Sequence, residues 1–201
     1  MDSRNRYPSQ ASQVTALNLP VSPRESLPPD LQKYFRICDD KIGFLPNVLA
    51  AYSFDEKKLR AFIGFYNELM LEDSPLSKLE REMIAVVVSS ANRCYYCQVA
   101  HGQAVRELSG DPALGELLVM NYRAAVLSAR HRAMLDFAHK MTVAADAIVE
   151  TDRQALRDAG FDDRSIWDIA SVAALFNLSN RMATAIDMMP NAEYHARNRG
   201  A

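Results

Sequence analysis

Apolar residues recur at three- and four-residue spacing through most of the chain after Pro29. Leu31, Phe35 and Cys38 begin this pattern, which places side chains on one face of an α-helix. The chain has only seven glycines, and β-branched residues gather mainly in the short segment 84–88. Because strands have no obvious place to form, we expect an all-α fold.

Capping residues and stop signals divide the chain into helical segments. Asp55 is a suitable N-cap, and Ser77 followed by Glu80 has the pattern of a capping box. Gly160 and Pro190 are stop signals. The predicted helices cover residues 29–42, 46–51, 55–70, 77–91, 93–109, 112–122, 128–146, 151–159 and 163–188.

The length of 201 residues is enough for one sizeable core, so we expect a single folded domain. Residues 1–29 contain five prolines among Ser and Gln. This composition predicts an extended arm that lies over the surface or over a neighbouring subunit. Residues 30–201 then form the helical domain.

The helix predicted for residues 77–91 is apolar on every face from Met83 to Val88, so it is expected to run through the centre of the domain. Residues 76–83 match residues 127–134 at four of eight positions. A duplicated helical lobe would give this pattern. The second copy lacks both the glutamate and the cysteines of the first, so only the first could be catalytic.

Charge and composition exclude several classes of function. The net charge is −2, and no run of like charges forms a face for nucleic acid. The apolar stretches 83–92 and 169–180 are far shorter than the roughly 20 residues of a membrane helix. The N-terminus lacks the apolar segment of a secretory signal, which predicts a cytoplasmic protein with no membrane contact.

Three cysteines are too few for a disulfide scaffold, and two of them, Cys94 and Cys97, form a CxxC motif. In a cytosolic chain this spacing indicates redox chemistry or metal binding. Cys38 stands alone on the apolar stripe of the first helix. It is therefore expected to be a buried core thiol, because free cysteine packs like a small apolar residue.

Cys94, Cys97 and His101 are spaced i, i+3 and i+7, which places them on one face if they share a helix. His101 would then lie one turn beyond Cys97 and about 10 Å along the axis from Cys94. We expect the imidazole to lower the pKa of Cys97 and make it reactive. Cys94 would resolve the oxidised Cys97 as a disulfide.

Glu82 can join this group only if the chain bends. On one continuous helix it would lie about 18 Å from Cys94. We predict a break at Asn92, which is a good N-cap for a new helix starting near Arg93. A carboxylate in so apolar a segment suits a proton relay. The alternative is that Glu82 forms a salt bridge with Arg81 or Arg93.

Glu82, Cys94, Cys97 and His101 are separated by eleven, two and three residues. This spacing resembles the signature of the alkylhydroperoxidase AhpD-like proteins within the carboxymuconolactone decarboxylase superfamily. The flanking residues are similar to the peroxidase-related branch of that superfamily, in three segments: 43–47, 76–82 and 92–97. The resemblance extends over residues 40–190 and leaves out the N-terminal arm.

This resemblance implies an AhpD-like fold that assembles as a homo-trimer or homo-hexamer. It also implies a hydroperoxide-reducing thiol peroxidase without metal, haem, flavin or any other cofactor. In such enzymes the second cysteine, here Cys97, attacks the peroxide and the first, Cys94, resolves it. Glu82 and His101 would relay protons, and a dithiol or lipoyl-type reductant would restore the thiols. The best-known member has a histidine where this chain has Tyr96, which is a poor proton relay at neutral pH.

Other readings of the same residues remain open. Cys94, Cys97 and His101 could bind zinc with a fourth ligand. The candidates for that ligand are Glu82, His131, His139 and His195. The cysteine pair would also suit a redox-sensing helical oligomer or a general disulfide oxidoreductase. A decarboxylase is disfavoured, because the superfamily's decarboxylases typically lack the cysteine pair.

The remaining features have structural interpretations. We expect His131, His139 and His195 to be surface or capping residues, and the nine methionines to pack in the core or at interfaces. Trp167 begins an apolar helix face. A late polar group in the last helix resembles the same helix of the family and is a candidate to line the pocket: Asn177, Asn180 and Arg181.

Overall fold

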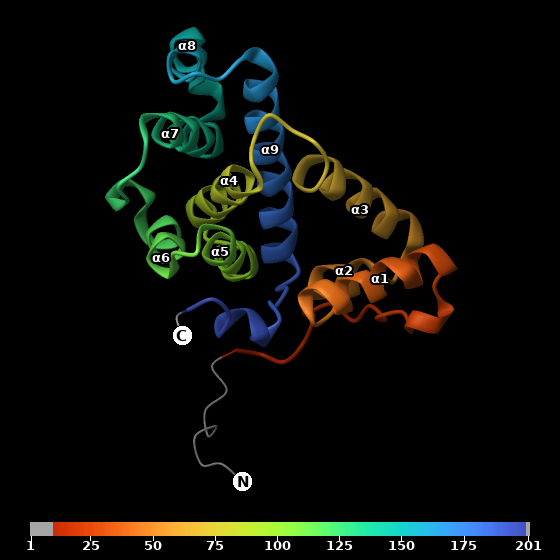
Figure 1. Ribbon diagram of the computed structural model, residues 1–201. Coiled ribbons are helices and arrows are strands. Elements are labelled where there is room, and N and C mark those ends of the chain that lie inside the picture. Colours follow the sequence, from red (N-terminus) through yellow and green to blue (C-terminus); the bar gives the residue numbers. More distant parts are fainter. Residues whose placement is uncertain (1–9, 200–201) are drawn as a thin grey trace.

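The computed structural model of the chain describes residues 10–199, and within this range it contains helices and no strands (Figure 1). The α-helices are α1 (Pro29–Ile42), α2 (Asn47–Tyr52), α3 (Glu56–Met70), α4 (Lys78–Ala91), α5 (Tyr95–Ser109), α6 (Pro112–Asn121), α7 (Ala129–Val143), α8 (Glu150–Asp158) and α9 (Asp163–Ala185). Short 3-10 turns lie between and beyond them. The expected all-α class is confirmed. No helix in the described range combines the length and apolar character that crossing a membrane requires.

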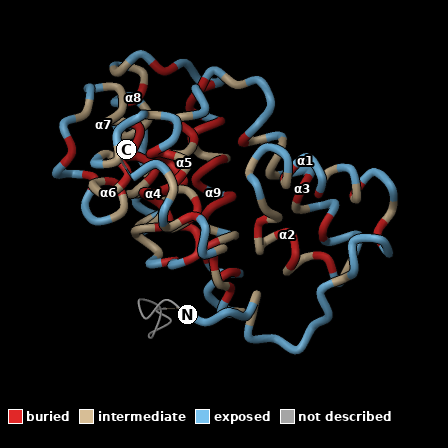
Figure 2. Tube along the Cα trace, turned by 60° about the horizontal axis from the view of Figure 1, so that its bottom comes forward, coloured by how far each residue is buried: buried red, intermediate tan, exposed pale blue. Residues whose placement is uncertain are grey.

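Helix α4 lies at the centre of the fold, as its sequence predicts. The segment from Met83 to Ser89 is buried without interruption, and α4 packs against α5, α6, α7 and α9. Figure 1 shows α9 running lengthwise between the group α1–α3 and the group α4–α8. In Figure 2 the buried positions gather along α4, α5 and α9. A segment with no polar face is thus covered on every side.

Local capping chemistry starts and ends several helices where the sequence predicts. The Ser77 hydroxyl accepts from the Glu80 backbone N–H at 3.1 Å, and the Glu80 carboxylate accepts from the Ser77 N–H at 2.8 Å. This is the expected capping box. Asp55 caps α3 through the Lys58 N–H. Gly43 ends α1 with φ of +83°, a conformation that costs glycine little.

The two similar segments begin their helices in the same way. Ser128 caps α7 as Ser77 caps α4, each hydroxyl accepting from the N–H three residues on. The two helices pack against each other, and Arg130 of α7 donates to the Glu80 carboxylate of α4 at 3.0 Å. The likeness of the segments therefore corresponds to a shared helix start.

Two helices end earlier than predicted. Helix α7 stops at Val143 instead of residue 146, because Ala144 leaves helical geometry and a separate 3-10 turn follows at Ala145–Ala147. Helix α9 stops at Ala185 instead of residue 188, and Asp187 takes a left-handed φ of +49°. Neither end carries a strong stop residue, which is why periodicity alone places them too late.

The N-terminal segment 10–28 is mostly extended and lies along its own subunit. Backbone hydrogen bonds of 2.9 and 3.1 Å join Ala16 and Val14 to the segment 186–189 that follows α9. The arm predicted from the prolines extends further, and its residues 1–9 lie outside the described residues.

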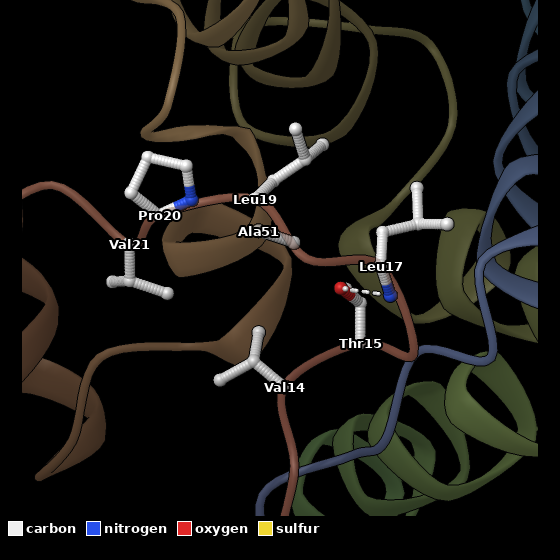
Figure 3. A pocket seen from close by; sticks show the side chains of 7 residues that line it. All are labelled: Val14, Thr15, Leu17, Leu19, Pro20, Val21 and Ala51. Carbon is white, nitrogen blue, oxygen red and sulfur yellow. Dashed lines mark hydrogen bonds between the residues drawn. The ribbon is translucent and has the colours of Figure 1, made fainter.

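A cavity of about 160 Å³ lies between this arm and α2 (Figure 3). The Thr15 hydroxyl accepts from the Leu17 N–H at 3.3 Å and shapes the turn beside the cavity. The lining is mostly apolar and consists of Val14, Thr15, Leu17, Leu19, Pro20, Val21 and Ala51. Because the lining has no ionisable side chain, this cavity is not a place for acid–base or thiol chemistry.

Candidate active site

A sharp turn connects α4 to α5 and creates the site. Arg93 takes a φ of +55°, which is unusual for a residue other than glycine. The Cys94 backbone N–H donates to the Ser89 carbonyl at 3.0 Å, which closes the turn. Helices α4 and α5 then pack side by side. The bend that the sequence required therefore exists, and it brings Glu82 of α4 back to His101 of α5.

Glu82 and His101 form a hydrogen-bonded pair. His101 Nδ1 and Glu82 Oε2 are 2.6 Å apart, and the side chains are only 13% and 12% exposed. The imidazole also packs edge-on against Phe176 of α9, with 4.6 Å between ring centroids. A carboxylate and an imidazole in short contact can hold and transfer a proton, and this setting keeps them largely away from water.

The arginines beside Glu82 and the turn have other environments. Arg81 is buried and donates to the backbone carbonyls of Glu72 and Leu69 at 2.8 and 3.3 Å. These carbonyls lie at the end of α3, where the helix dipole favours a cation. Arg93 is exposed on the turn. The salt-bridge alternative for Glu82 is therefore wrong.

Both cysteines of the motif lie at the start of α5. Cys94 is the N-cap residue and Cys97 is the third residue of the helix. They are 1% and 3% exposed, and neither forms a disulfide. They belong to one packed cluster with Tyr96 and Tyr194. The positive end of a helix therefore lies beside two enclosed thiols.

The two thiols differ in acidity. Hydrogen bonding by the Cys97 thiol, helped by the Cys97 backbone N–H, outweighs burial and lowers the pKa of Cys94 to about 7. Thr184 and the charge of His101 act in the same direction. The same contact with Cys94, together with burial, raises the pKa of Cys97 well above its ordinary value. The reduced pair therefore ionises first at Cys94.

This result differs from the spacing argument, which expected His101 to lower the pKa of Cys97. The physical reason is that contact with Cys94 and burial raise the pKa of Cys97, although Cys97 and His101 are one turn apart in α5 as expected. The geometry at Cys94 also differs from the prediction. Helix α5 starts at Tyr95 instead of Arg93, so Cys94 is an N-cap and not a helical residue. The i, i+3, i+7 geometry of a single helix does not apply to it. Asn92, predicted as the N-cap, instead ends α4.

The Asn92 side chain joins α4 to a polar group on α9. Its Nδ2 donates to Asn180 Oδ1 at 2.9 Å and to Asn177 Oδ1 at 3.1 Å. Asn180 Nδ2 donates to Ser89 Oγ at 2.9 Å. Sequence reasoning noted the two α9 asparagines without choosing between them. It missed Ser89, which follows the apolar stretch 83–88 and belongs to no motif.

Tyr96 is anchored away from acid–base work. Its hydroxyl oxygen accepts from the Val48 backbone N–H at 3.1 Å, near the start of α2. Burial raises its pKa well above the ordinary value, so it keeps its proton at neutral pH. The expectation that Tyr96 is a poor relay agrees with this environment.

Other predicted ligands and thiols lie elsewhere. Cys38 packs in a separate apolar cluster with α1–α3, as expected. The side chains of the remaining histidines have other neighbours: His131 has Glu80, His139 has Tyr122, and His195 has Tyr95 and Gln10. Among residues 10–199, no three His, Cys, Asp or Glu side chains are grouped to hold a metal ion. The zinc alternative therefore lacks a ligand set in this range.

The apolar face that Trp167 begins on α9 is exposed. Trp167 is 71% exposed and Leu178 52%. Trp167 also borders a groove of about 430 Å³ beside α7 and α8. Neither this groove nor the cavity at the arm is lined by any of the four predicted site residues.

Comparison with known proteins places this arrangement in a family. The profile of the Carboxymuconolactone decarboxylase family matches residues 56–140, which include all four site residues. The crystal structure of an uncharacterized peroxidase-related protein from Silicibacter sp. TM1040 is 61% identical, with a TM-score of 0.91, over 95% of this chain and 99% of that one. The chain belongs to the carboxymuconolactone decarboxylase family.

A second crystal structure identifies the branch of this family. It is described as an alkylhydroperoxidase AhpD core, an uncharacterized peroxidase-related protein from Ralstonia eutropha JMP134. It is 42% identical, with a TM-score of 0.90, over 94% of this chain and 99% of that one. The predicted resemblance to AhpD-like, peroxidase-related members of the carboxymuconolactone decarboxylase family is thus confirmed.

The fold also recurs at lower identity. The debrominase Bmp8 is 20% identical, with a TM-score of 0.73, over 92% of this chain and 96% of that one. That likeness concerns the fold alone. No curated protein matches this member of the carboxymuconolactone decarboxylase family.

Proposed function

We propose that this AhpD-like protein is a cofactor-free thiol peroxidase that reduces hydroperoxides through Cys94 and Cys97. The observation that carries the proposal is the placement of two buried thiols, Cys94 and Cys97, at the N-terminus of α5, the helix whose His101 pairs with a glutamate of α4. Hydrogen bonding by the Cys97 thiol lowers the pKa of Cys94. The thiolate is the nucleophilic form of cysteine, and a nearby thiol can capture its oxidised form. The peroxidase-related description of two relatives supports this class of reaction.

In the first step the Cys94 thiolate attacks the terminal oxygen of the hydroperoxide. An S–O bond forms as the O–O bond breaks, which leaves a sulfenic acid on Cys94 and an alkoxide. The Glu82–His101 pair supplies the proton that converts the alkoxide to an alcohol. Its short contact and low exposure support this role.

In the second step the Cys97 thiol attacks the sulfur of the Cys94 sulfenic acid. The S–S bond forms, and the hydroxyl leaves with the Cys97 proton as water. A dithiol or lipoyl-type reductant then restores both thiols. The family resemblance implied the opposite order, with attack by Cys97. We propose attack by Cys94, because hydrogen bonding by the Cys97 thiol, helped by the Cys97 backbone N–H, lowers the pKa of Cys94.

We also propose that the protein works as a homo-oligomer, a trimer or a hexamer, in the cytoplasm. Support for the oligomer comes from one face of α9, where Trp167, Leu178 and Met182 are 71%, 52% and 43% exposed. Large apolar side chains aligned on one helix face are typical of an interface. Size-exclusion chromatography with light scattering is expected to give three or six times the mass of one chain, and a monomer would overturn this proposal.

The test of the proposed reaction is exposure of the reduced protein to tert-butyl hydroperoxide, followed by thiol counting and intact mass spectrometry. The wild-type protein is expected to lose two hydrogens and to form a Cys94–Cys97 disulfide, while Cys38 remains reduced. Cys97→Ser is expected to gain one oxygen and to stop as the Cys94 sulfenic acid. Cys94→Ser is expected not to react. Unchanged thiols in the wild-type protein would overturn the proposal.

A general disulfide oxidoreductase is the second candidate, because a low-pKa thiol at a helix N-terminus suits thiol–disulfide exchange equally well. Reduction of insulin disulfides by the reduced protein measures this activity. Exchange with insulin without any reaction with the peroxide would favour the second candidate over the first.

A further inference from the structure

The turn between α4 and α5 brings exposed residues next to the cysteine pair. Cys94 is buried, but the residues on both sides of it, Arg93 and Tyr95, are exposed. Cys97 has no such neighbour before it, because Tyr96 is buried. Of the two thiols, Cys94 is therefore the one that adjoins the protein surface along the chain, and it does so beside an arginine.

A second arginine, Arg181 of α9, lies at the same turn and is also exposed. Its Nη1 donates to the carbonyl and to Oδ1 of Asn177, both at 2.8 Å. The same Oδ1 accepts from Asn92 Nδ2 at 3.1 Å, so one amide oxygen links the Arg181 guanidinium to the residue before Arg93. Two residues beyond Arg181, Ala183 packs in the cluster that contains both cysteines of the pair.

The positive charges of these two arginines are not matched by carboxylates. Arg60 and Arg157 show the usual arrangement in this protein, since each forms ion pairs with two acidic side chains. Among residues 10–199, no Asp or Glu side chain forms an ion pair with Arg93 or Arg181. The whole chain has a net charge of −2, so the positive charge at this turn is local and opposite in sign to the total.

We propose that Arg93 and Arg181 form a cationic docking surface for the reductant, and that the reductant is a dithiol that also carries a negative charge, such as a carboxylate. The proposal rests on the proposed function, which leaves the charge of the reductant open. A hydroperoxide is uncharged, so two unpaired cations do not help to recognise it. A dithiol attacks as a thiolate, and a further anionic group on the same molecule is attracted to the exposed arginines beside Cys94.

The reduction takes place in two exchanges at Cys94. The first thiolate of the reductant attacks Cys94 Sγ, the Cys94–Cys97 bond breaks, and its electron pair goes to Cys97 Sγ, which takes up a proton. The second thiolate then attacks the reductant's own sulfur in the mixed disulfide, and Cys94 leaves as a thiolate. The reductant ends as a cyclic disulfide after losing two electrons, which the two protein sulfurs gain. In both exchanges the reductant lies beside Arg93.

The test compares two reductants that share one carbon skeleton and differ in charge. The disulfide is prepared with diamide and then reduced either by dihydrolipoate, which has a carboxylate, or by dihydrolipoamide, which has a neutral amide. At about 0.01 M ionic strength, where screening extends over about 30 Å, dihydrolipoate is expected to react about tenfold faster. The ratio of the two rate constants is expected to approach one in about 1 M salt. A ratio of one or less at low salt would overturn the proposal.

Three substitutions locate the effect. Arg93→Gln and Arg181→Gln are each expected to lower the ratio about threefold, as for the loss of one exposed charge at a distance of several ångströms. Arg93→Lys keeps the charge and is expected to keep the ratio. Because the ratio compares two reagents on the same disulfide, a change in the acidity of Cys94 or Cys97 affects both rates and cancels. An unchanged ratio in both glutamine variants would overturn the proposal.

Arg36→Gln is the matched control. Arg36 is exposed on α1 and likewise has no carboxylate partner within the described part of the chain. Helix α1 belongs to the group on the other side of α9 (Figure 1). This variant changes the net charge by the same amount and is expected to leave the ratio unchanged. An equal fall in Arg36→Gln would show an effect of net charge alone and overturn the proposal.

The test uses no peroxide, so its outcome is separate from that of the proposed function. If the protein does not react with tert-butyl hydroperoxide but dihydrolipoate is preferred through Arg93 and Arg181, the peroxidase proposal fails and the docking surface stands. If the protein reduces the peroxide while the two reductants react equally, only the docking surface fails.

Discussion

Cys38 and Cys94 are both buried, with 8% and 1% of their surface exposed. Their pKa values nevertheless shift in opposite directions from the ordinary value of a cysteine thiol. Burial on the apolar face of α1 is the main cause that raises the pKa of Cys38 to about 11. The pKa of Cys94 is lowered to about 7, chiefly by hydrogen bonding with Cys97. Burial alone therefore does not set thiol reactivity in this protein. The direction of hydrogen bonding between neighbouring thiols also matters, since the Cys97 thiol lowers the pKa of Cys94 in spite of its burial.

The largest effect is expected from removing each thiol in turn. Cys94→Ala takes away the proposed nucleophile and is expected to lower peroxide turnover by roughly 10³-fold or more. Cys38→Ala is expected to leave turnover unchanged, because Cys38 lies in a separate cluster. Consumption of tert-butyl hydroperoxide in the presence of dithiothreitol measures both. Equal losses in the two variants would remove the distinction between the thiols.

Alkylation at controlled pH tests the acidities directly. At pH 8 a thiol with a pKa of about 7 is mostly thiolate, whereas a thiol with a pKa of about 11 is ionised about 10³-fold less. Because the pKa of Cys94 is lowered, its reactivity is present above about pH 7 and falls as the pH drops through that value. Iodoacetamide labelling with peptide mass spectrometry is the measurement. Labelling of Cys38 before Cys94 would contradict the lower pKa of Cys94.

Glu82→Gln keeps the shape of the side chain and removes the carboxylate from His101. We expect peroxide turnover to fall by about 10²-fold, as for loss of a general acid. Glu80→Gln is the matched control on the same helix, since Glu80 pairs with Arg130 at the start of α4. Steady-state rates of the two variants give the result. A loss of the same size in Glu80→Gln would indicate damage to α4 instead of loss of the relay.

The smallest effect concerns stability. Because Cys38 packs as a small apolar side chain, Cys38→Ala is expected to lower the free energy of unfolding by about 1 kcal/mol. Urea denaturation followed by circular dichroism measures this change. An increase in stability would show that the thiol is poorly accommodated, and the interpretation of Cys38 as a core residue would then fail.

Much of the fold could be predicted because its signals are local. The capping box of Ser77 and Glu80, the N-cap Asp55 and the terminal Gly43 each act within one helical turn. The central position of α4 follows from its lack of a polar face between Met83 and Ser89. Such features need no knowledge of distant parts of the chain.

The site was predictable only in part. The bend after α4 followed from the requirement that Glu82 reach the cysteines, and the Glu82–His101 contact confirms it. The start of α5 was placed two residues too early. With that shift Cys94 becomes an N-cap residue instead of a helical one. The pKa of Cys94, not that of Cys97, is lowered, chiefly by hydrogen bonding of the Cys97 thiol.

The contacts between α9 and α4 could not be predicted from the sequence. Asn180 and Ser89 are 91 residues apart in the sequence. Each belongs to a helix with many apolar residues. Helical periodicity shows which face a residue occupies, but not which residue of another helix it meets. The hydrogen bonds that join Asn180 to Ser89 and Asn92 could therefore be found only in the structure.

The short connection between α4 and α5 has a consequence for folding order. Glu82 and His101 are 19 residues apart, so they can meet after closing only a short loop. Asn180 belongs to the last α-helix and must be brought from far along the chain. During synthesis, the thiols and the acid–base pair are made before the residues of α9 that pack against the cysteine cluster. Until α9 has been made, the two sulfurs lack these neighbours.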